Sequence, residues 1–253
     1  MSGRAIKRKA VKKHDQSGKG AELPAEITIE DLRNSSAGEK ANATFLKIVL
    51  TALKLFHTNG YGPTTTRDIG RACKITAGGH LYYYIKSKED FPRIFREVAE
   101  VDTYRWIASV RQEMEHTPPD QLLEKCVREY ARSLHMRRKM MAFWFHAAVQ
   151  VNRDEYLKTM QNEVEGINLF QEVIMLGNRT GHFQVNDPYL LAVNIVMMCQ
   201  GWALKRWLIR DKRTIEQFID WIVQFVMSFA RGSPDHNSKP DVKGKASSRL
   251  AEQ

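Results

Sequence analysis

The chain has 253 residues, of which 43% are hydrophobic and 27% are charged, and this composition excludes wholesale disorder and a fibrous repeat. Its three cysteines lie far apart and form no Cys-x-x-Cys pair, which excludes a disulfide framework and a sulfur-rich zinc site. No apolar run approaches the roughly 20 residues that span a bilayer, and the N-terminus lacks the apolar core of a signal peptide. We therefore expect a cytoplasmic protein without membrane contact.

Positive charge is concentrated near the N-terminus. Residues 1–20 carry seven Lys or Arg and one Asp, and residues 40–91 carry eight basic and three acidic side chains, within a total net charge of +10. The remainder of the chain is close to neutral. This asymmetry predicts that the N-terminal third binds a polyanion, with nucleic acid as the leading candidate. For residues 1–20 alone, a tail that only maintains solubility is an equal alternative.

Local patterns predict a flexible arm followed by closely spaced helices. Residues 1–38 are polar and lack periodicity, so we expect a flexible basic arm there. Apolar residues recur at three- and four-residue intervals over residues 39–59, and Gly60 suits the position after a helix end. Thr65 and Asp68 form a Thr-x-x-Asp capping box, which predicts the start of a short helix.

A further short helix is expected over residues 77–85, after which Ser87 and Asp90 form a second capping box. The rest of the chain has helical periodicity without strand alternation. The expected long helices span residues 88–115, 120–136, 138–150, 154–176, 188–210 and 214–231. The tail, residues 232–253, is polar and is predicted to be disordered.

A capped helix, a tight turn and a second short helix, set against a preceding amphipathic helix, form the pattern of a helix-turn-helix motif. The second short helix carries His80 and a run of three tyrosines, whose ring nitrogens and hydroxyls can bond phosphates or base edges. Consecutive tyrosines cannot all face one interior, whereas Leu81 and Ile85 are expected in the core. The motif predicts that this helix faces outward and enters a DNA groove.

These residues resemble the DNA-binding domain of TetR-family transcriptional regulators. The resemblance covers about residues 43–95 and is carried by Gly-Tyr at 60–61, Thr-Thr-Thr-Arg-Asp-Ile at 64–69, Ile-Thr-Ala-Gly at 75–78 and Leu-Tyr-Tyr-Tyr-Ile-Lys-Ser-Lys-Glu-Asp at 81–90. The C-terminal body looks like the helical ligand and dimer domain of that family. The implied fold is all-α, with a three-helix helix-turn-helix domain (residues 39–90) followed by a helical bundle (residues 91–231) that binds an effector and dimerises.

The resemblance implies a homodimeric regulator, a repressor by preference with an activator as the alternative, which binds a palindromic site in double-stranded DNA. A small molecule in the second domain would release it. Phosphate contacts are implied for Thr65, Tyr82 and Lys88. The complete set of expected DNA-binding residues is Thr44, Lys47, Thr65, Thr66, Arg67, Thr76, Ala77, Gly78, Gly79, His80, Tyr82, Tyr83, Tyr84 and Lys88.

Two positions depart from the family pattern. Five residues, instead of four, separate Ile75 from Leu81. Because adjacent glycines cost about 1 kcal/mol each inside a helix, we expect the additional residue in the turn or the first helical turn. Lys74 stands where the family usually has glycine, so a left-handed backbone is expected at a non-glycine residue.

The effector site is expected near residues 140–149, which are too apolar on all sides for a surface helix. Ordinary core packing is the alternative for each residue. Because basic residues 137–139 adjoin this segment, we expect an apolar or aromatic carboxylate, or its acyl-CoA thioester. The expected effector-binding residues are Trp106, Arg132, Met140, Phe143, Trp144, His146, Phe170, Met197 and Trp202.

The last two long helices have apolar faces that suit either a dimer interface or the interior of the protomer. The sequence holds no HExxH, Glu-x-x-His or Gly-rich phosphate loop, so we expect no enzyme activity, no catalytic or metal site and no cofactor. The alternative function is a helical adaptor or nonspecific nucleic-acid-binding protein without an effector. Competition with random DNA at physiological salt distinguishes these two functions.

Overall fold

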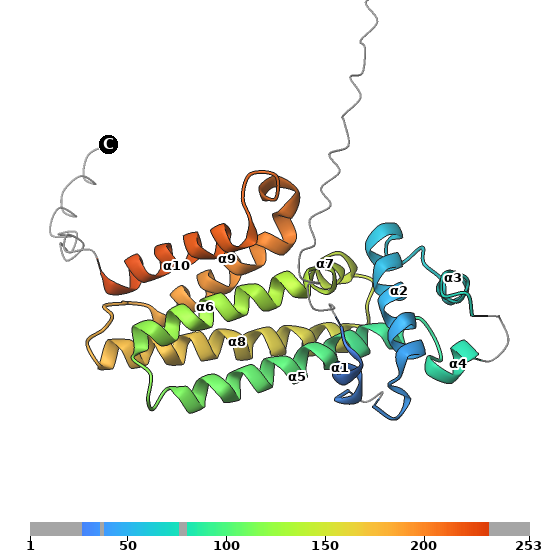
Figure 1. Ribbon diagram of the computed structural model, residues 1–253, viewed down its shortest axis with the longest axis horizontal. Coiled ribbons are helices and arrows are strands. Elements are labelled where there is room, and N and C mark those ends of the chain that lie inside the picture. Colours follow the sequence, from blue (N-terminus) through green and yellow to red (C-terminus); the bar gives the residue numbers. More distant parts are fainter. Residues whose placement is uncertain (1–26, 36–37, 76–79, 233–253) are drawn as a thin grey trace, which may run out of the picture.

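The computed structural model describes residues 27–35, 38–75 and 80–232, and every regular element in these ranges is helical, as expected for an all-α fold (Figure 1). The shorter helices of the N-terminal part gather towards one end of the molecule, and the longer helices form an elongated body beside them. In chain order the elements are α1 (Ile29–Arg33), the 3₁₀ turn η1 (Gly38–Lys40), α2 (Ala43–Asn59), α3 (Thr66–Ala72), α4 (His80–Tyr84), α5 (Asp90–Glu113), α6 (Pro119–Met136), α7 (Arg138–Ala147), α8 (Arg153–Arg179), α9 (Pro188–Ile209) and α10 (Ile215–Arg231).

Capping side chains explain where two helices begin. Helix α2 starts at Ala43, later than expected, because the Asn42 side chain accepts a hydrogen bond from the Phe45 amide (3.0 Å). Helix α5 starts at Asp90, and the Asp90 carboxylate accepts hydrogen bonds from the backbone amides of Lys86 (2.7 Å) and Ser87 (3.2 Å). The predicted helix start at residue 88 with a Ser87 cap is therefore wrong, because Asp90 closes the preceding turn.

Helix α1 corrects the expectation of a flexible arm over residues 1–38. Thr28 caps this helix in a capping box with Asp31, and the Thr28 amide donates to the Asp31 carboxylate at 2.7 Å. Ile27 and Leu32 are fully buried, where α1 packs against α2 and α5. The prediction failed over residues 27–35 because three apolar side chains in a polar segment are too few for a periodic signal. Residues 1–26 and the predicted disordered tail from residue 233 onward lie outside the described ranges.

Two hydrophobic cores organise the chain, and they do not follow the predicted domain boundary. One core joins α6, α8, α9 and α10 with the end of α5. The other joins α1 to α4 and the start of α5 with residues from α7, although α7 lies some fifty residues beyond the helix-turn-helix in the sequence. Helix α7 also packs against α6 and α9. Thus α7 connects the end of the molecule that holds α2 to α4 with the helical body (Figure 1).

Candidate functional site

Helix α3, which precedes the turn to α4, is capped at its N-terminus by a side chain. The Thr65 hydroxyl donates to the Asp68 carboxylate (2.6 Å) and accepts from the Asp68 amide (3.2 Å), so the predicted capping box is confirmed. These hydrogen bonds lower the pKa of the Asp68 carboxyl group. At the end of α3, Lys74 has a φ of 56°, which is the left-handed conformation that the sequence pattern predicted. Residues 76–79, which include the expected DNA-binding residues Thr76, Ala77, Gly78 and Gly79, lie outside the described ranges.

Helix α4 presents two of its three tyrosines to solvent. Leu81 and Ile85 are buried, as expected, while the side chains of Tyr82 and Tyr83 are each 60% exposed. Lys40 lies over the Tyr83 ring at 5.5 Å from its centre. An exposed pair of amphipathic rings on a short helix can bond phosphates and base edges.

Tyr84 is held by the protein itself. Its ring stacks on Phe45 at 5.5 Å, and its hydroxyl exchanges hydrogen bonds with the Asn42 side chain at 3.0 and 3.2 Å. These contacts fasten α4 to the N-terminal end of α2. The sequence run suggested a DNA contact for Tyr84, but its position favours a role in orienting Tyr82 and Tyr83.

Lys88 also has a structural role. Its ammonium group donates to the backbone carbonyls of Tyr61 (3.0 Å) and Gly62 (3.1 Å) and lies 4.6 Å from the centre of the Tyr61 ring. An ammonium group has three N–H donors, so one donor is left for a phosphate. Burial, with a smaller effect of Glu89, raises the pKa of Tyr61 to about 12, which keeps its phenol neutral.

The remaining expected DNA-binding residues that the structure describes are at the surface. Thr66 is half-buried, and the exposed ones are Thr44, Lys47, Thr65, Arg67 and His80. They come from α2, α3 and α4, at the end of the molecule opposite most of α10 (Figure 1). Their combination of hydroxyl and cationic groups can contact a polyanionic backbone.

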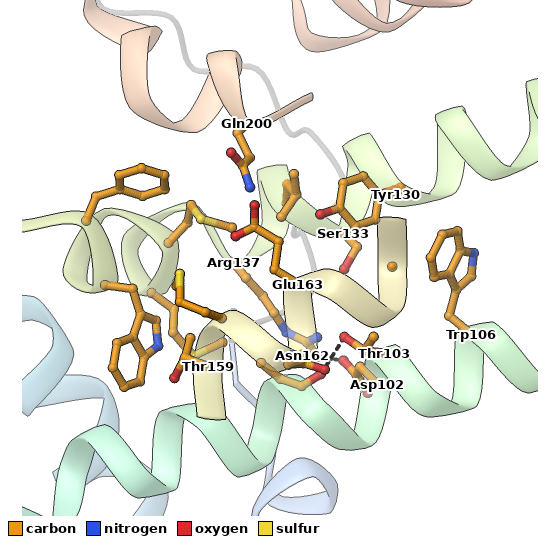
Figure 2. A pocket seen from close by; sticks show the side chains of 18 of the residues that line it. Asp102, Thr103, Trp106, Tyr130, Ser133, Arg137, Thr159, Asn162, Glu163 and Gln200 are labelled. Atoms are coloured by element: carbon orange, nitrogen blue, oxygen red, sulfur yellow. Dashed lines mark hydrogen bonds and ion pairs between the residues drawn. The ribbon is translucent and has the colours of Figure 1, made fainter. Parts of the chain in front are cut away.

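A cavity of about 730 Å³ lies inside the helical body, enclosed by α5, α6, α7 and α8 and by Gln200 of α9 (Figure 2). This volume is within the usual range for sites that bind small molecules. Apolar side chains from α6, α7 and α8 form much of its wall, namely Leu134, Met140, Met141, Trp144, Phe145 and Met160.

The cavity wall contains polar groups that have no hydrogen-bond partner among the described residues. These groups are the indole N–H of Trp144, the side-chain oxygen of Asn162 and the side-chain nitrogen of Gln200. Trp144 and Gln200 are only 6% and 5% exposed. Buried polar groups are normally paired, so unpaired ones around a cavity are suited to hydrogen bonding with a bound molecule. Figure 2 shows Gln200 and Glu163 approaching the cavity from different helices.

Charged groups on the cavity wall are partly compensated. Arg137 forms an ion pair with Asp102, which also lies 3.5 Å from Arg105. Glu129 accepts a hydrogen bond from the Trp106 indole at 3.1 Å. The Tyr130 phenol has a raised pKa because it is buried and faces the charge of Glu163, so it remains a neutral donor.

The structure places three of the nine expected effector-binding residues on the cavity wall: Trp106, Met140 and Trp144. Phe170 lies behind the wall, where it packs on Trp106 and Tyr130. Phe143 faces the other way, into the rings of Phe56, Tyr61 and Phe95.

The other four expected effector residues also lie off the cavity. Arg132 is bound by both oxygens of Glu216, at 3.2 and 2.8 Å, and Trp202 donates to His135 at 2.7 Å. His146 and Met197 are exposed. Sequence reasoning selected them because aromatic, Met and basic residues at helical spacing do not indicate which way each side chain points.

Several polar cavity residues were missed by the sequence analysis, among them Thr103, Tyr130, Ser133, Asn162 and Gln200. Each lies on a long helix, and all but Gln200 have polar or charged neighbours in the sequence. Gln200 offered the clearest signal, because it interrupts the apolar face of α9. A polar residue among apolar ones indicates a buried partner or ligand only when the other helices are known.

Other reactive chemistry is sparse in the described ranges. Burial raises the pKa of the thiols of Cys126 and Cys199 to about 12, so both remain protonated. No group of three or more His, Cys, Asp or Glu side chains suited to a metal ion is found among these residues. Within the same ranges, none of the helices combines the length and the apolar character required to cross a membrane.

Two family models match this chain: bacterial regulatory proteins of the tetR family over residues 48–91, and the tetracyclin repressor-like C-terminal domain over residues 116–228. The HTH-type transcriptional regulator HbdR of Aromatoleum sp. (strain CIB) is 25% identical over 176 residues, which are 69% of this chain and 75% of that protein.

Solved structures share the fold. FadR from Bacillus subtilis in complex with stearoyl-CoA has a TM-score of 0.56 and 15% identity, covering 73% of this chain and 98% of that one. AibR in complex with isovaleryl coenzyme A and operator DNA has a TM-score of 0.57 and 21% identity, covering 74% and 98%. With its helix-turn-helix at one end and its helical body at the other, this chain belongs to the TetR family of DNA-binding transcriptional regulators.

Proposed function

We propose that the chain is a repressor that binds a palindromic operator as a homodimer and leaves it when an apolar effector enters the cavity. The observation that carries this proposal is the position of α7. Met140 and Trp144 of α7 line the cavity and also belong to the core of the helix-turn-helix, into which Phe143 packs. A ligand that moves α7 would therefore change the position of α2 and α4.

For the DNA contact, Tyr82 and Tyr83 are the proposed groups of the recognition helix, and Lys47 and the third donor of Lys88 are proposed to bind phosphates. The exposure of Tyr82, Tyr83 and Lys47 supports these roles, and Lys88 is half-buried. A protein that binds an operator must be in the compartment that holds the chromosome, so we propose a cytoplasmic location.

The effector proposed is an apolar or aromatic acid as its acyl-CoA thioester. The cavity supplies apolar wall and unpaired donors for a thioester or carboxyl oxygen, and two structural neighbours carry an acyl-CoA in their described complexes. We propose that this role involves no catalysis.

The first experiment selects bound genomic fragments with the full chain and then measures gel shifts under excess random DNA at physiological salt. A regulator keeps one preferred palindrome, whereas a nonspecific binder or adaptor loses every preference. Loss of preference would overturn the proposal in favour of that second function.

Two substitutions examine the recognition surface. Tyr83→Ala should change base preference and weaken the preferred site about 5- to 100-fold, whereas Lys47→Ala should weaken all sites alike and reduce the salt slope by about one. Tyr104→Ala is the matched control, since Tyr104 is 53% exposed on α5 outside this surface. If Tyr104→Ala had the same effect as Tyr83→Ala, the surface would be assigned wrongly.

A calorimetric panel of acyl-CoA thioesters, free acids and cationic drugs identifies the effector class. We expect acyl-CoA thioesters to bind and to release the operator. Binding of cationic drugs alone would overturn the acyl-CoA assignment, because the acidic residues Asp102, Glu129 and Glu163 of the wall would then be the recognition groups.

A further inference from the structure

A second polar site lies outside the cavity, where the start of α7 meets the end of α9. Arg138 begins α7, and Arg206 and Arg210 lie at the end of α9, next to the α6 residue His135. None of the four lines the cavity. Each of the three arginines is positively charged at neutral pH.

Arg206 is the unusual member of this group. Its Nε atom is buried and has no partner among the described residues, and in those residues no carboxylate lies within ion-pair distance of its guanidinium. A guanidinium has five N–H donors, so leaving it without an acceptor in a half-buried position is costly. Such a group is suited to receiving an acceptor from outside the chain.

The charges around Arg206 have the same sign. Burial and the neighbouring charges of Arg138 and Arg210 lower the pKa of Arg206. By contrast, the pKa values of Arg128 and Arg132 are raised by the carboxylates to which they hydrogen-bond. The site is therefore a local excess of positive charge.

Nearby acids neutralise this excess only in part. Glu216 is occupied by Arg132 through two hydrogen bonds, while Asp211 forms an exposed ion pair with Arg210 at 3.5 Å. Arg138 donates to the backbone carbonyl of His135 at 2.9 Å, which leaves its other donors available.

His135 adds a directed donor. The Trp202 indole can only donate, so in their 2.7 Å hydrogen bond the Nδ1 atom of His135 is the acceptor. Neutral His135 therefore carries its proton on Nε2. An N–H donor thus stands beside the arginine cluster in addition to the guanidinium groups.

We propose that Arg138, Arg206 and Arg210, with His135, form a binding site for a phosphate or pyrophosphate group. Arg206 and Arg138 supply charge-assisted hydrogen bonds to the phosphate oxygens, and Arg210 adds charge from the exposed side. The site does not depend on the cavity being an effector site. The phosphate belongs either to a free inorganic anion or to the phosphate-bearing end of a coenzyme A thioester.

The experiment titrates the full chain with sodium pyrophosphate and, separately, with free coenzyme A, using calorimetry at low salt. Arg206→Met removes the charge and keeps most of the side-chain volume. Arg153→Met is the matched control, because Arg153 is exposed on α8 and its loss changes the net charge equally. We expect Arg206→Met to raise the Kd for pyrophosphate about 10- to 100-fold, and Arg153→Met to leave it within about twofold.

Folding is monitored by thermal unfolding of each variant without anion. Because Arg206→Met relieves repulsion between like charges and removes an unpaired buried donor, its Tm should equal or exceed that of the parent chain. A loss of binding in this variant is then a loss of the site, not of the fold.

The two anions distinguish the sources. If coenzyme A competes with pyrophosphate and has a much lower Kd, the site binds the coenzyme. If the two Kd values are equal, the site binds a free anion. If neither anion bound, or if Arg206→Met and Arg153→Met raised the Kd equally, the proposal would be overturned. The proposal would also be overturned if the parent chain bound no anion and Arg206→Met weakened its self-association. A carboxylate of a partner subunit would then occupy the cluster. Failure of an effector to release the operator leaves the pyrophosphate result unaffected.

Discussion

Lys74 adopts a conformation that suits glycine. The hydrogen bonds from the Lys74 amide to Arg71 (3.1 Å) and from the Ile75 amide to Gly70 (3.1 Å) form a Schellman end to α3, in which Lys74 takes the left-handed position with φ 56°. A side chain in this region costs about 1–2 kcal/mol. The sequence pattern predicted a left-handed backbone at Lys74, and the structure shows a Schellman motif there with lysine in place of the usual glycine.

Lys74→Gly should therefore stabilise the protein by about 0.5–1 kcal/mol, after the greater flexibility of glycine in the unfolded chain is subtracted. Lys74→Ala is the control, because it removes the charge and retains the strained φ, and it should change stability little. Urea unfolding of the three proteins measures both effects. Equal stabilities for Gly and Ala variants would mean that the backbone at residue 74 carries no strain.

His135 should make stability depend on pH. Burial and the charges of Arg138 and Arg206 lower its pKa, against a smaller opposing effect of Glu216. A histidine with a lowered pKa favours folding in its neutral form, so its contribution is complete above the unfolded value of about 6.5 and is lost as pH falls through the folded pKa. Protonation of Nδ1 would also break the hydrogen bond from Trp202.

We expect the free energy of unfolding to decrease between pH 7.5 and pH 5.5, and to decrease less in His135→Asn, which keeps an acceptor but does not titrate. Urea unfolding at a series of pH values in a phosphate-free buffer provides the measurement. If the parent and the variant had parallel pH profiles, His135 would not be the titrating group.

At the scale of elements, helix periods and caps could be read from the sequence, but the orientation of helices could not. The predicted segment 138–150 became α7, and Gly60, with φ 87°, ends α2 as expected. The cavity was only partly anticipated because its polar wall is assembled from side chains on five helices. Which face of α7 meets the cavity depends on packing with α2 and α9, and local periodicity contains no information on that choice.

Phe143 is one of the α7 residues that pack into the helix-turn-helix core. Its ring lies 5.6 Å from those of Phe56 and Tyr61 and 5.1 Å from that of Phe95. Phe143→Leu should cost about 1 kcal/mol of stability. It should also reduce, about 2- to 10-fold, the ratio of operator Kd values with and without an acyl-CoA effector, while effector binding to the free protein is retained.

The control for Phe143→Leu is Phe183→Leu, which makes the same change at a buried residue packed on Gly177, away from the cavity wall and from α7. Fluorescence anisotropy with a labelled operator gives the ratio. An unchanged ratio in Phe143→Leu, or an equal reduction in both variants, would mean that α7 does not transmit the signal through this ring.

At the scale of the whole molecule, α9 and α10 expose large apolar side chains that a single protomer leaves uncovered. On α10, Trp221 and Phe225 stack at 5.7 Å and are 56% and 48% exposed. The large apolar side chains exposed on these two helices are Tyr189, Leu190, Met197, Trp207, Leu208, Trp221, Phe225 and Phe229. Large exposed apolar side chains concentrated on two helices are typical of an interface, and two successive DNA grooves require two recognition helices.

We expect Trp221→Glu combined with Phe225→Glu to convert the proposed dimer to monomers, because aromatic residues at interface centres contribute about 2 kcal/mol or more each. Sedimentation velocity measures the change, and circular dichroism should show unchanged helicity, since both side chains project from the protomer surface. Tyr104→Glu, a single charge at an exposed tyrosine on α5, should remain dimeric.

The monomeric variant should bind a half-site as well as the palindrome, because the entropic advantage of two linked recognition helices is lost. A double variant that stays dimeric and still prefers the palindrome would require the protomers to pair through another face.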